Sequence, residues 1–269
     1  MPVDHYENFP VASILLPASL REPVAAIYAF ARSADDFADE GSLPAAERLR
    51  LLNDYKAELD AIAADRPTRH PVFLRLRPVI AAHGLPLQLF HDLLDAFSQD
   101  VAKDRYENFA ELMDYCRRSA DPVGRLLLHL FDAATPGNLT RSDCVCSALQ
   151  LINHWQDVAI DWQKPRLYLP REDLVRFGVG EAQIGAGVCD DHWRALMRFQ
   201  VDRARSLMLA GAPLGRDLPG RIGLEIRAIV AGGLRILDKI EAVNYDIFRR
   251  RPVLDKPDWA RILWRMLLP

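Results

Sequence analysis

The chain has 269 residues, with 34 basic and 37 acidic side chains, and half of its residues are hydrophobic. This apolar content excludes an intrinsically disordered protein, which lacks the buried apolar area that offsets the entropy of the chain. The net charge of -3 argues against a protein that binds nucleic acid by neutralising phosphates, so no nucleic-acid partner is expected. Four cysteines are too few for a disulfide framework in a chain of this length.

Apolar residues recur at spacings of three and four along most of the chain, which predicts α-helices. Strand patterns are scarce, so we expect an all-α protein in one domain over residues 1–269. The polar stretch 162–171 and the glycine-rich stretch 178–187 are predicted loops, and Pro67 and Pro71 are interpreted as boundaries. Pro122 and Gly124 predict a kink or a break inside a helix. The predicted helices cover residues 21–40, 44–64, 89–97, 109–131, 142–161, 191–211 and 220–249, before a short amphipathic tail at 259–268.

Neither a secretory signal nor a membrane-spanning segment is predicted. The first residues lack a basic segment followed by an apolar one, and the apolar stretch 11–31 is interrupted by charged residues and prolines. A cytoplasmic location is the expectation. The apolar tail, with Ile262, Leu263 and Trp264, fits either docking on the helical bundle or a peripheral membrane contact, and docking is preferred.

Two short acidic runs lie on otherwise apolar helices. In the first run, Asp35 and Asp39 are four residues apart, as are Asp36 and Glu40. Each pair therefore shares a helix face, about one turn apart. Carboxylates at this spacing repel one another, so their presence requires solvent, a basic partner or a bound cation.

The second run places Asn153, Asp157 and Asp161 at two successive spacings of four, within about 80° of helical arc. Such oxygen ligands suit Mg²⁺, which also binds phosphate oxygens of a substrate. Arg32 and Arg166 stand near the two runs and provide guanidinium groups suited to bidentate phosphate contact. A single aspartate pair would be an ordinary surface feature, but two such runs favour a site for a metal-bound diphosphate.

Three stretches carry a resemblance to a known family. Residues 28–40 resemble the first aspartate-rich motif of the squalene/phytoene synthases, residues 115–124 their tyrosine–cysteine helix, and residues 150–170 their second motif. Residues 7–13, with 121–125 and 153–157, are most similar to the branch of bacterial hydroxysqualene synthases of the hopanoid pathway.

The resemblance implies an all-α isoprenoid synthase bundle with a central cavity. It also implies that the catalytic residues are Tyr28, Tyr115, Asp35, Asp39, Asp157 and Asp161. Two or three Mg²⁺ ions are implied on Asp35, Asp39, Asn153, Asp157 and Asp161. Asp36 and Glu40 are candidates for supporting these ligands. The implied substrate-binding residues are Phe9, Arg32, Gln150, Asn153, Arg166 and Tyr168.

The implied reaction is Mg²⁺-dependent conversion of presqualene diphosphate to hydroxysqualene. The implied functional partners are a presqualene diphosphate synthase and a hydroxysqualene reductase. Glu7-Asn8-Phe9 replaces the Ser-x-Ser-Phe element of most of the family, and Gln156 stands where several relatives carry Arg. Both departures suit an enzyme that receives one diphosphate rather than two.

Two other functions stay open. One is a head-to-head synthase that condenses two farnesyl or geranylgeranyl diphosphates to presqualene diphosphate, squalene or phytoene. The other is a non-catalytic bundle that acts as an assembly factor. No NADPH is expected, because the glycine pattern at residues 178–183 lacks the third glycine and the strand–turn–helix context of a dinucleotide site.

Overall fold

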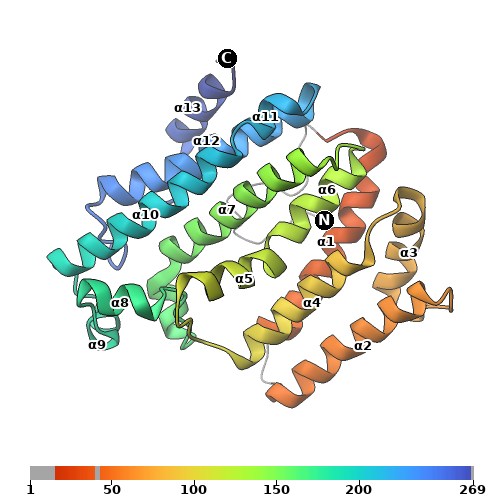
Figure 1. The fold of residues 1–269 in the computed structure, drawn as a ribbon, viewed down its shortest axis with the longest axis horizontal. Coiled ribbons are helices and arrows are strands. Elements are labelled where there is room, and N and C mark those ends of the chain that lie inside the picture. The colour runs from red at the N-terminus through yellow and green to blue at the C-terminus, as the bar shows by residue number, and fades with distance from the viewer. Residues whose placement is uncertain (1–15, 40–42, 268–269) are drawn as a thin grey trace. The chain divides into compact units, whose positions relative to one another are not determined.

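The structure is a computed structural model that describes residues 16–39 and 43–267, with the backbone alone at Asp39 and at 264–267 (Figure 1). The described residues form α-helices and one isolated parallel bridge, between Arg105 and Leu167. The predicted all-α class is confirmed.

The described chain divides into two compact units. Unit 2 comprises Pro17–Asp104 and Ala110–Ser147; unit 1 comprises Leu16, Arg105–Phe109 and the described chain from Ala148 onward. The helices of the first half are α1 (Ala18–Asp39), α2 (Ala45–Ala63), α3 (Pro71–His83), α4 (Leu87–Ala102), α5 (Phe109–Ser119), α6 (Asp121–Leu130) and α7 (Pro136–Gln163), which continues into unit 1. Those that follow are α8 (Arg171–Phe177), α9 (Glu181–Gly185), α10 (Asp191–Gly211), α11 (Leu214–Asp217), α12 (Gly220–Ala242) and α13 (Lys256–Leu267).

An aromatic cluster fills the core of unit 2. The Phe30 ring on α1 is fully buried and lies 5.2 Å from that of Phe90, 5.7 Å from that of Phe73 and 5.9 Å from that of Tyr55. The pairs with Phe73 and Phe90 are edge-to-face, a geometry that adds about 0.5–1.5 kcal/mol for each pair beyond the area that it buries. This cluster fixes α1 against α2, α3 and α4, so the acidic side chains of α1 lie off its buried face.

Helices α6 and α7 approach closely at Gly124. A methyl group added there would lie 2.3 Å from Ser142 Oγ and 2.5 Å from Cys146 Sγ. The predicted break between residues 109 and 131 falls at Ala120, and Pro122 stands in the first turn of α6, where its missing N–H costs nothing. The predicted break is confirmed.

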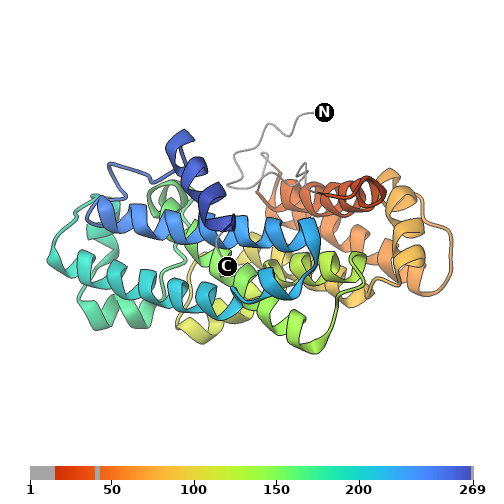
Figure 2. The ribbon, with the colours of Figure 1, turned by 90° about the horizontal axis from the view of Figure 1, so that it is seen from above.

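Helix α13 docks on α12 within unit 1 (Figure 2). Ile262 is buried against Ala231, and Asp258 is 1% exposed. The Asp258 carboxylate accepts from Arg235 Nε at 2.6 Å and also from Lys239 Nζ. The preferred docking of the tail on the helical bundle is therefore confirmed for the described side chains of α13. The Leu263 side chain is 57% exposed, and the Trp264 side chain is not among those described. In the part of the chain described, no helix is long and apolar enough to cross a bilayer.

Several predicted boundaries were wrong. Helix α3 was not predicted, although Pro71, which was interpreted as a boundary, is the first residue of that helix, a position that tolerates proline. The predicted loop 178–187 contains the short helix α9. The helix predicted to reach residue 249 ends at Ala242, since Asn244 and Tyr245 adopt left-handed backbone conformations that stop an α-helix.

Candidate active site

The first acidic motif lies on the last turns of α1, in unit 2. Arg32 pairs with Asp35 at 3.1 Å and with Asp36 at 2.6 Å, so one guanidinium offsets two carboxylates on the same helix. All three side chains are between a quarter and two-fifths exposed, which leaves them accessible to a ligand. The Asp39 side chain and the whole of Glu40 lie outside the described residues.

Tyr115 lies on α5 and is 4% exposed. Its hydroxyl donates to Asp100 Oδ2 at 2.9 Å, which fixes the direction of the phenol. Asp100 was not predicted, because it lies near the end of α4 and shares no helical spacing with Tyr115. Tyr28 is half-buried on α1, and Phe9 lies outside the described residues.

The second motif lies on α7, within unit 1. Asn153 is exposed, and Asp157 and Asp161 are partly buried, whereas the intervening Trp155 and Val158 are buried. The three oxygen-bearing side chains thus share one face of α7, as predicted. Their oxygen atoms are hard donors of the kind that Mg²⁺ prefers, so their chemistry fits the implied metal. Among the described residues, no three acidic, histidine or cysteine side chains converge on one point.

Asp157 has a partner that the sequence analysis missed. Arg251 donates through Nε and a terminal nitrogen to its two oxygens, the second at 3.1 Å. The preceding residue, Gln156, is 1% exposed, and its side-chain amide donates to the Pro252 carbonyl at 2.7 Å. The only sequence signal was the basic run Arg249-Arg250-Arg251 at the end of the predicted helix 220–249.

An aromatic stack supports the segment that follows α7. The His154 ring lies parallel to that of Tyr168 at a centroid distance of 3.6 Å, and Tyr168 stacks on Tyr106 at 5.7 Å. Burial, and then the nearby Arg166 charge, lower the pKa of His154 to about 3, so the imidazole is neutral at physiological pH. Its Nε2 lies 3.2 Å from Gln150 Nε2, which joins this predicted substrate-binding residue to the stack.

Residues 105–109 fasten the same segment. Arg105 forms the parallel bridge with Leu167 and donates to the Pro165 carbonyl at 2.7 Å. The Arg171 N–H donates to the Tyr106 carbonyl at 2.9 Å, and that of Glu172 to the Glu107 carbonyl at 3.0 Å. These bonds position the stretch that carries Arg166 and Tyr168, so the predicted loop 162–171 is held by backbone pairing.

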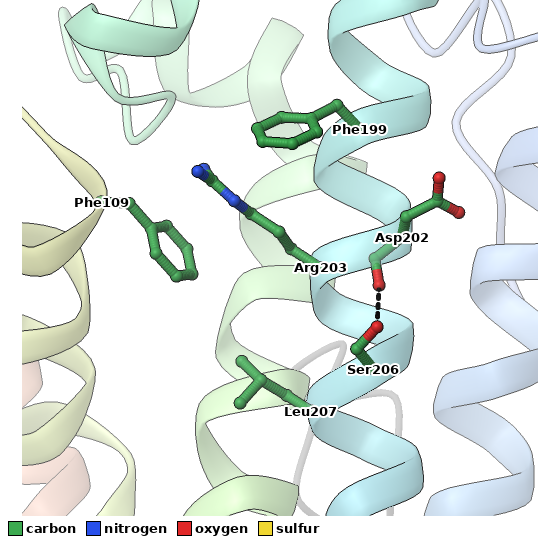
Figure 3. Close-up of a pocket in the computed structure, with 6 residues that line it drawn as sticks. All are labelled: Phe109, Phe199, Asp202, Arg203, Ser206 and Leu207. Atoms are coloured by element: carbon green, nitrogen blue, oxygen red, sulfur yellow. Dashed lines mark hydrogen bonds between the residues drawn. The ribbon is translucent and has the colours of Figure 1, made fainter.

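An open groove of about 340 Å³ lies elsewhere on unit 1 (Figure 3). The Arg203 guanidinium lies between the rings of Phe109 and Phe199, 4.2 and 4.1 Å from their centroids, and pairs with the buried Asp173 at 2.5 Å. The guanidinium of Arg203, on α10, therefore has an aromatic ring on each side and contacts Phe109, the first residue of α5. The groove is lined by Phe109, Phe199, Asp202, Arg203, Ser206 and Leu207, none of them a predicted site residue.

Comparison with known proteins gives the family. The model of the squalene/phytoene synthases matches residues 3–258. The chain belongs to the squalene/phytoene synthase family. Members of this family are enzymes that act on prenyl diphosphates, and the chain is one of these enzymes.

The relatives of this squalene/phytoene synthase include hydroxysqualene synthases. It is 36% identical to the hydroxysqualene synthase of Rhodopseudomonas palustris, across 87% of this chain and 80% of that protein. It is 31% identical to the 15-cis-phytoene synthase of Synechococcus elongatus, across 95% and 86%. The crystal structure of squalene synthase HpnC from Alicyclobacillus acidocaldarius superposes with a TM-score of 0.83 at 37% identity, covering 90% of each chain. The expected isoprenoid synthase fold is confirmed.

Proposed function

We propose that this squalene/phytoene synthase is a hydroxysqualene synthase, which converts presqualene diphosphate to hydroxysqualene and diphosphate. The observation that carries the proposal is a difference in sequence identity between two groups of relatives. Three relatives named hydroxysqualene synthase are 35–36% identical to the chain, whereas the phytoene synthases of cyanobacteria are 30–31% identical. The complete set of oxygen-bearing side chains in both motifs supports a catalytic function over that of an assembly factor.

In the proposed mechanism, Asp35, Asp39, Asn153, Asp157 and Asp161 would hold two or three Mg²⁺ ions, which would supply positive charge that offsets the charge of the departing diphosphate. Arg32 and Arg166 donate hydrogen bonds to diphosphate oxygens, and Asp36 and Glu40 support the ligands of the first motif. Phe9, Gln150 and Tyr168 complete the substrate-binding set.

The tyrosines act on the organic part of the substrate. Loss of diphosphate leaves a cyclopropylcarbinyl cation, which the rings of Tyr28 and Tyr115 stabilise by roughly 0.5–2 kcal/mol each. The hydrogen bond from Tyr115 to Asp100 orients that ring. A water molecule then adds to the rearranged cation, its oxygen forming the new C–O bond and its proton leaving to solvent, which gives the alcohol. No nicotinamide takes part.

A comparison of two alternative substrates tests this function. Purified protein with MgCl₂ is incubated with presqualene diphosphate or with farnesyl diphosphate alone, and the products are separated by gas chromatography with mass detection. We expect hydroxysqualene from presqualene diphosphate, with ¹⁸O incorporated from labelled water. Conversion of farnesyl diphosphate alone to presqualene diphosphate would instead establish the head-to-head synthase.

Two aspartate variants separate catalysis from structure. Asp35→Asn and Asp157→Asn each remove a carboxylate while keeping the shape of the side chain. We expect both to lose activity by more than about 100-fold, with thermal unfolding nearly unchanged because both side chains are partly exposed. Activity retained with a large fall in stability would favour the assembly factor.

The surrounding steps follow from the chemistry. A presqualene diphosphate synthase would supply the substrate, and a hydroxysqualene reductase would consume the product. Both substrate and product carry long apolar chains, so we include a peripheral membrane contact through the exposed side of α13 in the proposal. Co-sedimentation of the full chain with anionic liposomes, with and without Leu263→Glu, tests that contact; equal pelleting of both proteins would contradict it.

A further inference from the structure

The segment between α12 and α13 is fastened to the second acidic motif by two adjacent contacts. Arg251 donates two hydrogen bonds to Asp157, one to each carboxylate oxygen, and the Gln156 side chain donates to the Pro252 carbonyl at 2.7 Å. Gln156 is 1% exposed, whereas Arg251 and Asp157 are each 26% exposed. The buried amide therefore fixes the backbone from which Arg251 reaches the more accessible carboxylate.

A guanidinium on both oxygens of Asp157 opposes a divalent cation on the same carboxylate. The fork of the guanidinium takes one bond on each oxygen, and Mg²⁺ requires a carboxylate oxygen at about 2.0–2.1 Å. Two cations on one carboxylate also repel each other, since their separation is far below the screening length of about 8 Å. A metal bound at Asp157 therefore gains by displacing Arg251.

We propose that Arg251 is a positioning residue that competes with the divalent metal for Asp157, so that metal binding releases the segment around residues 249–252 from α7. This inference rests on the proposed function, because it takes Asp157 to be a metal ligand. Gln156 sets the strength of the competition, since it holds the backbone next to Arg251 in place.

Metal binding in the absence of substrate tests the proposal directly. Isothermal titration of the full chain with MnCl₂ is compared among wild type, Arg251→Gln and Arg250→Gln. Arg250 is an exposed neighbour, so its variant removes the same charge one residue away. We expect Arg251→Gln to bind Mn²⁺ about fivefold more tightly than wild type, a modest factor because the ion pair is partly exposed to solvent. Arg250→Gln should stay within twofold of wild type.

Limited trypsinolysis reports on the segment itself. In wild type, MgCl₂ should accelerate cleavage after Arg249 and Arg250 by about fivefold or more, because the segment leaves α7. In Arg251→Gln, cleavage should be equally fast with and without the metal. Gln156→Met keeps all charges but removes the donor to Pro252, and it should give an intermediate Mn²⁺ affinity. This variant also keeps the test available if Arg251→Gln does not fold.

The outcomes are distinct. Tighter binding in Arg251→Gln but not in Arg250→Gln, with an intermediate affinity in Gln156→Met and metal-dependent cleavage in wild type, supports the competition. Equal Mn²⁺ affinity in wild type, Arg251→Gln and Gln156→Met overturns it while leaving the metal site of the proposed function intact. Absence of Mn²⁺ binding in every protein, at concentrations that support turnover, overturns both the competition and the assignment of Asp157 as a ligand.

Discussion

Replacing Asp121 by asparagine is expected to stabilise the protein at neutral and alkaline pH. Asp121 is 5% exposed in the first turn of α6, and its Oδ1 accepts from Ser147 Oγ at 2.8 Å. Burial raises the pKa of Asp121 from 3.8 to about 7; the bond from Ser147 opposes this effect, and the charge of Asp143 adds to it. The charged carboxylate is therefore disfavoured in the folded protein.

The sign and size of the effect follow from proton linkage. Between pH 3.8 and about 7 the folded state holds a proton that the unfolded state has lost, so the stability falls as the pH rises through this window. Ionisation of Asp121 then costs roughly 2 kcal/mol at pH 5.5 and roughly 4 kcal/mol at pH 8. Asparagine removes this cost and keeps the acceptor for Ser147, although its NH₂ group needs a partner, which reduces the gain by about 1–3 kcal/mol.

Urea unfolding followed by circular dichroism at pH 5.5 and pH 8 measures the difference. The stability of Asp121→Asn relative to wild type should increase by about 2 kcal/mol between the two pH values, whatever the constant cost of the NH₂ group. Ser147→Ala should act in the opposite direction, because it removes a bond that favours the carboxylate. A relative stability of Asp121→Asn that is equal at both pH values would refute the reasoning.

Three further stability predictions follow from packing and buried charge. Gly124→Ala should lose about 1–3 kcal/mol in urea unfolding, because its methyl group would overlap two side chains of α7, whereas Gly137→Ala, with no atom within 4 Å of the added methyl, should be neutral or slightly stabilising. Asp258→Ala should lose about 3 kcal/mol and expose α13 to proteolysis, since it removes the buried carboxylate that Arg235 and Lys239 share and leaves Lys239 only its more exposed partner Asp255; unchanged protease resistance would contradict this. Asp173→Ala should lose a similar amount, because this 2% exposed carboxylate holds side chains of α10, and an unchanged melting temperature would show that it does not.

The fold was predictable where two signals agreed. Helix α10 runs from Asp191 to Gly211, as predicted, because its apolar period begins beside the capping residue Asp190 and ends near a glycine. Helix α3 was missed because proline has opposite meanings at the first position of a helix and in its interior. The end of α12 depends on two left-handed residues, Asn244 and Tyr245. Asparagine adopts this conformation more readily than most residues and was a stop signal that the prediction did not use, whereas tyrosine gives no such signal.

The candidate site was predictable along each helix but not across the chain. The shared face of Asn153, Asp157 and Asp161 follows from helical spacing alone. The bond between Arg251 and Asp157 joins residues 94 positions apart, and the stack of His154 on Tyr168 joins a helix to a loop. Neither contact repeats with any helical period, so both depend on tertiary packing that a single sequence does not specify.

Residues 105–109 belong to unit 1, although the residues on both sides of them in the sequence belong to unit 2. This arrangement matters when the enzyme is divided into two fragments. A cut after residue 147, at the boundary of the two units, divides α7 and also leaves the C-terminal fragment without residues 105–109, which pair with the stretch around Leu167 and Arg171. If the two fragments were co-expressed, residues 105–109 of the N-terminal fragment would have to bind the C-terminal fragment before the stretch around Arg166 could adopt its observed position. During synthesis, residues 105–109 likewise emerge from the ribosome some sixty residues before their docking surface exists.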